Sequence, residues 1–303
     1  MFSTASEAAG GIAGLGWGMF LGAAALFALV MGLTAWAVWG RTRLGHQGQQ
    51  RLILAGGFGL PVVVLSALLG YSVSLGESIV ARHDPEALQV EVTAHRFWWE
   101  VRYLNCAPQP LVTANEIHLP KDRPVQFILR SSDVIHSFWV PALAGKIDMV
   151  PGRINFLQTQ PTRLGAFRGQ CAEFCGEQHA KMALWVVVRE PADFDRWVAR
   201  ESAPPPPPAG SDAAAGARLF LEAGCGTCHR VAGTPAQGRQ GPDLSHVASR
   251  RTIGAGILPA NANGFAAWIA DVQHLKAAAP MPSYDVLDGA QLNALAAYLA
   301  GLQ

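Results

Sequence analysis

Two long stretches near the start of the chain contain no charged residue, and they constrain the fold more than any other feature. The first covers residues 17–39 and the second covers residues 52–76. A helix as long as the first stretch extends about 35 Å, which exceeds a hydrocarbon core of about 30 Å. Pro61 and several glycines in the second stretch are tolerated in membrane helices. The sequence therefore predicts two transmembrane helices.

The segment between these helices indicates their orientation. Residues 41–51 hold three arginines and no acidic residue, so the positive-inside rule places this segment in the cytoplasm. Both termini and everything after about residue 78 are then expected on the periplasmic side of a bacterial inner membrane. A cleaved secretory signal is the alternative for the first stretch, but Glu7 precedes it without any Lys or Arg, and the apolar run is too long.

Composition excludes some functions and directs attention to the cysteines. The 23 Lys and Arg against 22 Asp and Glu leave a net charge of +1, which argues against a nucleic-acid binder. Four of the five cysteines form two tight pairs, 171/175 and 225/228, a spacing unusual for a disulfide framework. Cys106 is left over, and we interpret it as an incidental or loop-packing thiol.

The outer part of the chain divides into two modules with a connector. Residues 88–190 contain short runs of β-forming residues between turns, which indicates a Greek-key sandwich or barrel. Five consecutive prolines, 204–208, predict a semi-rigid spacer about 16 Å long. Beyond Asp212, apolar residues recur at helical spacing and predict a small all-α domain. The expected divisions are a two-helix hairpin in 1–80, a β domain in 81–200, a linker in 201–211 and a helical domain in 212–303.

The second cysteine pair carries a haem motif. Cys225-Gly-Thr-Cys228-His229 is the Cys-x-x-Cys-His pattern of c-type haem attachment, in which the histidine supplies an axial nitrogen. A thioredoxin-like pair or half of a zinc site are the alternatives, and both lack their usual context here. Met281, flanked by two prolines, is the favoured second axial ligand, with His246 and His274 as the remaining candidates.

The helical segment resembles a class I cytochrome c domain. The resemblance is carried by the haem motif, by Gly241-Pro242 after it, and by Met281 before a terminal helix. It implies that the Pro242 carbonyl orients His229.

The first cysteine pair lies in a second constellation of metal-binding residues. Two thiolates, two imidazoles and a thioether suit copper better than zinc, and a structural disulfide is the alternative. A single blue-copper centre needs only one cysteine, so the second thiolate with a backbone donor indicates two bridged metals. The residues of this constellation are His136, Cys171, Glu173, Cys175, His179 and Met182.

Nearly the whole chain resembles subunit II of the haem–copper oxidases, the CuA-bearing subunit of cytochrome c oxidase. The paired spans, the β domain and the Cys-x-Glu-x-Cys-x-x-x-His-x-x-Met motif over 171–182 carry the resemblance, and the fused haem domain points to the caa3 type. It implies a membrane hairpin, a cupredoxin-like Greek-key barrel and a class I cytochrome c domain.

The resemblance also implies ligand roles. Cys171 and Cys175 would bridge both coppers of a dinuclear CuA centre. His136 with Met182 would complete one copper, and His179 with the Glu173 carbonyl would complete the other. The Glu173 side chain would also reach a magnesium ion at the subunit I interface, and Asp133 and Asp148 match acidic positions of the family near the copper and that interface.

Aromatic residues over 97–99 occupy the segment through which electrons of the family approach copper. Phe97 and Trp98 are the first candidates, with Trp99 beside them, and many relatives have Trp in place of Phe97. Ordinary strand packing is the alternative for any of these side chains. The family often has an acid at the start of the second span that helps to admit protons, and Gln50-Arg-Leu52 supplies none.

The expected function is electron input to a terminal oxidase. Electrons from a donor such as a cytochrome c or the bc1 complex would pass from haem c to CuA and on to haem a in subunit I. Oxygen would be reduced there at haem a3 and CuB, coupled to proton translocation, while this chain performs no bond chemistry.

Subunit III and membrane lipid are further expected partners, and nucleic acid is not expected to bind. The alternatives are a CuA-containing nitric oxide reductase and a membrane-anchored redox protein without a catalytic partner. A quinol oxidase subunit would lack the copper ligands.

Overall fold

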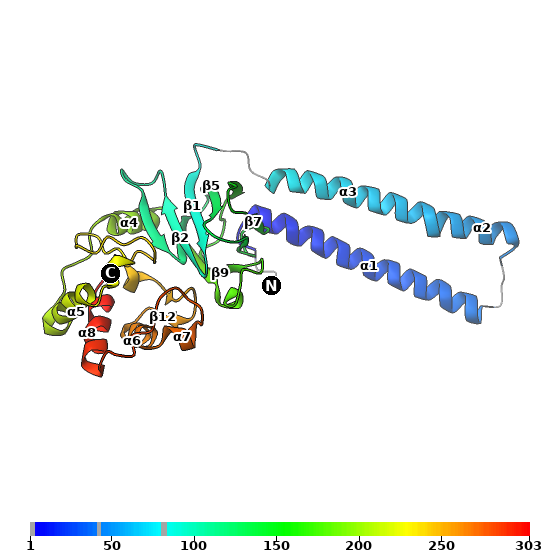
Figure 1. Cartoon of the computed structure of the whole chain (residues 1–303). Helices are drawn as coiled ribbons and strands as arrows, with labels where there is room; N and C mark the ends of the chain where they lie inside the picture. Colours follow the sequence, from blue (N-terminus) through cyan, green and yellow to red (C-terminus); the bar gives the residue numbers. More distant parts are fainter. Residues whose placement is uncertain (1–3, 41–43, 80–83) are drawn as a thin grey trace.

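The computed structural model describes residues 4–40, 44–79 and 84–303, with side chains of the second segment up to residue 76. It has three parts: an elongated helical hairpin, a β domain and a C-terminal helical domain on the far side of the β domain (Figure 1). Arg41 and Arg43 of the predicted cytoplasmic segment lie outside the described residues.

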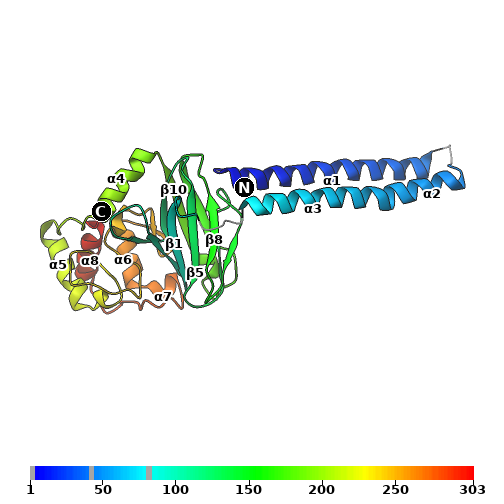
Figure 2. The ribbon, with the colours of Figure 1, turned by 90° about the horizontal axis from the view of Figure 1, so that it is seen from above.

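The hairpin consists of two long apolar arms that lie side by side in both views (Figures 1 and 2). The first arm is α1 (Glu7–Trp39), and the second runs through α2 (His46–Leu54), a π-helical turn (Ala55–Gly59) and α3 (Leu60–Ile79). Both arms are long and apolar enough to cross a membrane, and large apolar side chains along them are exposed. Exposing so many apolar side chains to water would be unfavourable. The arms are therefore suited to contact with lipid and with neighbouring helices.

The N-terminal end of α1 is fastened to the β domain. The Ala5 N–H donates to the Ala142 carbonyl at 2.7 Å, and the Ser6 hydroxyl donates to the Leu143 carbonyl. Ser6 also caps α1 by accepting from the Ala9 N–H. The N-terminal end of α1 and the C-terminal end of α3 lie nearest the β domain, and the end of α1 and the start of α2 lie farthest from it (Figure 1).

The β domain is a sandwich of two five-stranded sheets, in which β1 pairs in parallel with β5 and β4 with β10. The first sheet has the order β3 (Leu111–Ala114), β2 (Trp98–Tyr103), β1 (Leu88–His95), β5 (Val125–Ser131), β8 (Asn155–Thr159). The second has the order β4 (Glu116–Pro120), β10 (Ala183–Arg189), β9 (Gly165–Cys171), β6 (His136–Trp139), β7 (Ile147–Met149). The predicted strand regions are confirmed, and the sandwich is cupredoxin-like.

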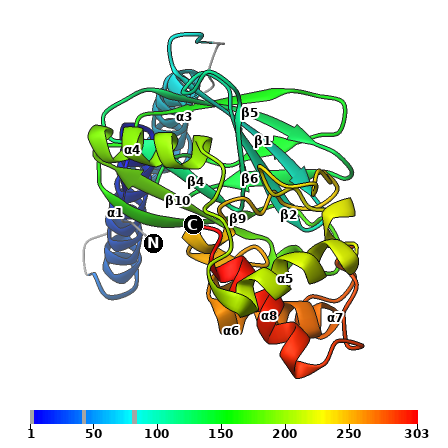
Figure 3. The same ribbon diagram turned by 90° about the vertical axis from the view of Figure 1, so that its left-hand side faces the viewer.

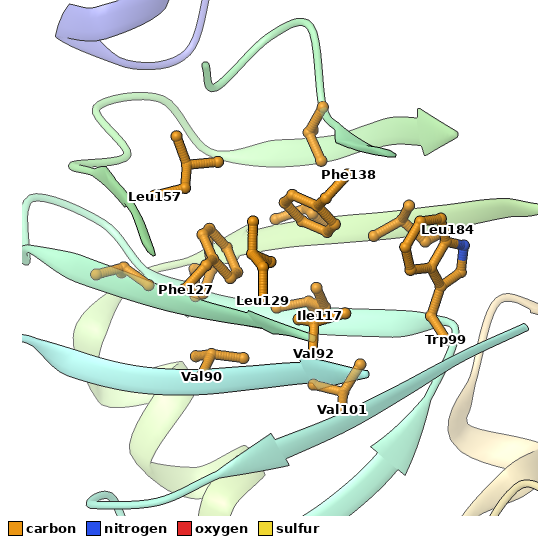
Figure 4. Close-up of a cluster of buried hydrophobic side chains, with 14 of the residues drawn as sticks. Val90, Val92, Trp99, Val101, Ile117, Phe127, Leu129, Phe138, Leu157 and Leu184 are labelled. Atoms are coloured by element: carbon orange, nitrogen blue, oxygen red, sulfur yellow. The ribbon is translucent and has the colours of Figure 1, made fainter. Parts of the chain in front are cut away.

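Alternation along the strands builds the core between the sheets. β1 buries every second residue, so that Val90 and Val92 point inward together with Phe127 of the neighbouring strand β5, and they meet Phe138 of β6 in the facing sheet (Figure 4). Trp99 is fully buried at one end of this core, edge-on to Phe138 with ring centroids 5.9 Å apart. The tightly packed core makes a rigid support for the loops at the ends of the sandwich.

Helix α4 (Pro191–Ser202) leaves the last strand and covers one edge of the sandwich, where Trp197 stacks on His118. The five prolines that follow do not extend freely between the domains. They line a groove together with Val231, Pro235 and Tyr298 of the helical domain, and Gly233 approaches Pro204 closely. The connector therefore belongs structurally to the surface of the helical domain.

The helical domain is built on the crossing of α5 (Gly210–Glu222) and α8 (Gly289–Ala300). A Cβ atom at Gly216 would lie 2.0 Å from the Ala294 carbonyl oxygen, so only glycine permits this close crossing. The remaining elements surround the crossing (Figure 3). They are α6 (Ala262–Ala270), α7 (Val272–Leu275), the 3-10 turns Cys225–Thr227 and Val247–Ser249, and the short pair β11 (Thr252–Ile253) and β12 (Leu258–Pro259).

Candidate copper and haem sites

The predicted copper ligands come together at one end of the β sandwich. His136 begins β6, Cys171 ends β9, and the loop before β10 supplies the other ligands. The Cys171 and Cys175 sulfurs are 3.8 Å apart. The His136 Nδ1 atom lies 3.8 Å from the Cys171 sulfur, and the His179 Nδ1 atom lies 3.8 Å from the Cys175 sulfur.

Two further donors complete this cluster. The Met182 sulfur lies 3.9 Å from the Cys175 sulfur, and the Glu173 carbonyl oxygen lies 3.2 Å from the Cys171 sulfur. His136, Cys171 and Cys175 are buried and present ligand atoms within 4.8 Å of one another. Both cysteines are free thiols, which argues against the disulfide alternative. A buried set of two sulfurs, two imidazoles and a thioether fits copper.

The two thiols differ in their electrostatic surroundings. The neighbouring Cys175 thiol holds the pKa of Cys171 well below its usual range, and the same contact raises the pKa of Cys175. One of the two thiols is therefore the more easily ionised. Asp133 lies 2.7 Å from the His136 Nε2 atom, so that nitrogen carries the proton and Nδ1 is left free toward the sulfurs.

The second site is a cavity of about 510 Å³ in the helical domain. Cys225, Cys228 and His229 line one part of it, and Met281 lines another. The His229 Nδ1 atom donates to the Pro242 carbonyl at 2.8 Å, which confirms the contact that the resemblance implied. Burial lowers the pKa of His229, so the ring is neutral and its Nε2 atom can bind a metal. A Cβ at Gly241 would lie 2.5 Å from this ring, which explains the glycine.

Of the three candidates for the second axial ligand, only Met281 lines the cavity. His246 is hydrogen-bonded to the Ala203 carbonyl and His274 is exposed, and neither lines the cavity.

Arg250 also lines the cavity, and sequence reasoning did not identify it. Its buried Nε atom has no hydrogen-bond partner among the described residues. A buried cation in an apolar cavity suits an anionic substituent of the bound group, so the cavity fits haem.

The β domain forms part of the cavity wall, and this arrangement was not predicted. Phe97, Trp98 and Asn115 of the β domain line the same cavity as His229 and Met281. Phe97 is 5 % exposed, and its ring packs close to Gly176, the residue after Cys175. A Cβ atom added at Gly176 would lie 3.2 Å from the Phe97 ring. Phe97 therefore contacts both sites.

The other aromatic candidates have different surroundings. Trp98 is half-buried and stacks on His95 with ring centroids 4.4 Å apart. Trp99 is fully buried, its ring centroid lies 6.3 Å from that of His136, and it does not line the cavity, so it packs against a predicted copper ligand.

The remaining acidic and thiol candidates lie around the sandwich. Glu173 is half-buried, and Asp148 is exposed on β7 beside Lys146. Cys106 is half-buried and packs against the β-domain core, in agreement with a loop-packing role.

This fold and these sites define a membrane-anchored electron-transfer protein with a copper domain and a haem c domain. The model of the cytochrome c oxidase subunit II periplasmic domain matches residues 89–189, and the cytochrome c model matches residues 213–303. The chain is 36 % identical to cytochrome c oxidase subunit 2 of Alkalihalophilus pseudofirmus over 250 residues, which is 80 % of this chain and 71 % of that protein. The protein belongs to the cytochrome c oxidase subunit II family.

Two further matches are also second subunits of cytochrome oxidases. Cytochrome c oxidase subunit 2 of Bacillus subtilis is 33 % identical over 255 residues, covering 80 % of this chain and 70 % of that protein. The crystal structure of the periplasmic domain of subunit II of cytochrome oxidase from Bradyrhizobium japonicum is 29 % identical, with a TM-score of 0.37. That match covers 41 % of this chain and 96 % of the other.

Membership in this family settles the class of function. The chain is the subunit through which electrons enter a terminal oxidase, an oxidoreductase complex, and it works beside other oxidase subunits. Its relatives are oxidase subunits, so neither a nitric oxide reductase nor a redox protein without a catalytic partner is favoured.

Proposed function

We propose that this chain carries electrons from a haem c in its helical domain to a dinuclear copper centre in its β domain, and on to haem a in subunit I. When bound, the haem and the two coppers supply one-electron transfer, and the chain makes and breaks no bonds itself. The observation that carries the proposal is that Phe97 contacts both the haem cavity and the residue next to Cys175.

The two clusters support the proposed ligands. Cys225 and Cys228 would attach the haem, and His229 and Met281 would hold its iron. Cys171, Cys175, His136, Met182, His179 and the Glu173 carbonyl would hold the copper centre. The sulfur and nitrogen distances around the two cysteines support this set.

Other protein groups orient the ligands and restrict their movement. Asp133 fixes the His136 tautomer, and the Pro242 carbonyl orients His229. The packed sandwich restricts movement of the copper ligands, which limits the rearrangement that accompanies a change of charge.

The setting of the chain is also a proposal. The N-terminal end of α1 and the C-terminal end of α3 lie beside the β domain, so both outer domains are at one end of the hairpin (Figure 1), and we propose that this end is periplasmic because residues 41–51 hold three arginines. We propose that Glu173 reaches a magnesium ion at the subunit I interface, and that subunit III and a donor such as a cytochrome c or the bc1 complex are further partners.

The test uses the complete oxidase purified in detergent. We expect one covalently bound haem in this chain, and a copper electron paramagnetic resonance signal whose hyperfine structure arises from two equivalent nuclei. Oxygen consumption should exceed nitric oxide consumption with the same donor. A signal from a single copper nucleus, or zinc in its place after copper loading, would contradict the proposal.

A further inference from the structure

Lys276 is buried at the interface between the β domain and the helical domain. It follows α7 directly and is 3 % exposed. Its Nζ atom donates to the Phe97 carbonyl of the β domain at 2.8 Å and to the Gly254 carbonyl of its own domain at 2.8 Å. Lysine side chains normally keep their ammonium groups in water, so a buried one needs a specific arrangement of acceptors.

The carbonyl that Lys276 binds belongs to the residue that contacts both cofactor sites. Phe97 lies in the tight turn between β1 and β2, where His95 pairs with Trp98. Its ring lines the cavity of His229 on one side and approaches Gly176 on the other. A bond to this backbone therefore fixes the position of the ring that separates the two sites.

The rest of the interface does not depend on Lys276. The Arg251 N–H donates to the Glu116 carboxylate at 2.7 Å, and the Ala183 N–H donates to the Ala255 carbonyl at 3.0 Å. Lys181 donates to the Leu275 carbonyl at 2.8 Å from an exposed position. These bonds join the domains without touching Phe97, so the particular contribution of Lys276 is the placement of the aromatic ring.

We propose that Lys276 is a positioning residue for internal electron transfer, holding Phe97 between the haem cavity and the copper motif. This inference rests on the proposed function. The transfer moves one electron from ferrous haem c, which becomes ferric, to the oxidised copper centre, which is reduced by one electron. No bond forms or breaks, and Lys276 is not oxidised or reduced. Because electron transfer between two fixed centres depends on the packed atoms between them, a displaced Phe97 that breaks the contact between the haem cavity and Gly176 slows the transfer.

The experiment compares Lys276→Met with Lys181→Met in the purified oxidase. Lys276→Met keeps the apolar stem and removes the donors. Lys181→Met removes the same kind of amino group and a bond to a carbonyl across the same interface, and that bond does not involve Phe97. Haem c is reduced by a light pulse, and its reoxidation by copper is followed by absorbance, together with the onward transfer into subunit I.

We expect the haem-to-copper rate to fall at least tenfold in Lys276→Met and less than twofold in Lys181→Met. The onward rate, the haem and copper spectra and both reduction potentials should be unchanged, which a general loss of structure would not allow. If Lys276→Met loses haem or copper, Lys276→Gln is measured with the same expectation, because its shorter side chain cannot reach both carbonyls.

Two results would overturn the inference: an unchanged haem-to-copper rate in the Lys276 variant, or equal losses in the two lysine variants. A wild-type complex without the haem or without the copper pair would instead refute the proposed function. The failures of the two ideas are therefore distinguishable.

Discussion

The His136 Nε2 atom lies 2.7 Å from a carboxylate oxygen of Asp133, while the opposite nitrogen of the same ring faces the Cys171 sulfur. Asp133 is only partly exposed, and its other oxygen accepts the Arg96 N–H at 2.7 Å. The carboxylate is thus held from two sides, and it fixes the imidazole in the orientation that a copper ligand needs.

The first prediction concerns this carboxylate. Replacing Asp133 with Asn removes the charge that fixes the His136 tautomer, so copper affinity should fall about 10- to 100-fold. Competition with a copper chelator measures the affinity. Asp122→Asn is the matched control, because Asp122 is exposed and far from the copper motif, and its φ of 58° is one that asparagine tolerates. Equal copper affinity in wild type and Asp133→Asn would show that the contact does not act on the metal.

The second prediction separates the two sites through their methionines. Met281→Leu should keep the haem attached through Cys225 and Cys228 but lower its reduction potential by on the order of 0.1 V, because axial ligands set haem potentials over about 0.8 V. The copper signal should not change. Met182→Leu should show the reverse pattern, with altered copper spectrum and potential and unchanged haem bands. Visible spectra and potentiometric titrations test both, and if either variant alters both centres, the ligand roles proposed above are wrong.

The third prediction concerns the packing of the axial histidine. A Cβ at Gly241 would lie 2.5 Å from the His229 ring, so Gly241→Ala should displace the ring and destabilise the haem domain by about 1–3 kcal/mol. The displaced ligand should also shift the haem absorption bands. Gly289→Ala at the start of α8 is the control, because a Cβ there meets nothing within 4 Å. Thermal unfolding followed at the haem band measures both variants, and equal midpoints would count against the close contact.

The fourth prediction is a pH dependence of stability. Burial lowers the pKa of Lys276 to about 7, while Cys175 opposes this shift and the positive charge of Lys181 adds to it. In the unfolded chain the pKa is near its ordinary value of 10.5, so between these values the unfolded state binds more protons than the folded state. Raising the pH from about 7 toward 10.5 should therefore favour the folded, docked form through this group.

Urea unfolding of the full chain at pH 7 and pH 9 measures this effect, with Lys276→Met as the reference. The difference in unfolding free energy between wild type and variant should move in favour of the wild type as the pH rises, by up to about 1.4 kcal/mol per unit. A difference that is constant with pH would mean that Lys276 titrates normally in the folded protein.

The motifs of this protein are readable from sequence because each is local. The haem motif occupies residues 225–229, and five of the six predicted copper ligands lie within residues 171–182. Their spacing therefore identifies haem attachment and copper binding. The two apolar stretches are equally local, since helix length and the absence of charge decide their membrane role. The strand regions follow from alternation, which Val90 and Val92 of β1 display on one face.

Lys276 and Arg250 illustrate what spacing does not reveal. Lys276 precedes three alanines in a loop, and nothing in that pattern indicates that its partner is a carbonyl 179 positions earlier. Arg250 gives no signal beyond its charge, although it lines the haem cavity. The prolines 204–208 predict a spacer, and their position along a groove with Val231 and Tyr298 of the helical domain is not visible in the sequence.

The sequence by itself determined the chemistry: two apolar spans, a set of soft copper ligands and a haem motif with its histidine and a candidate methionine. Only the tertiary structure decided that Phe97 lines the haem cavity while its ring approaches Gly176, and that Lys276 binds its carbonyl. The physical reason is that ligand identity is a property of side-chain type and near-neighbour spacing. The docking of two domains depends instead on buried contacts between segments far apart in the chain.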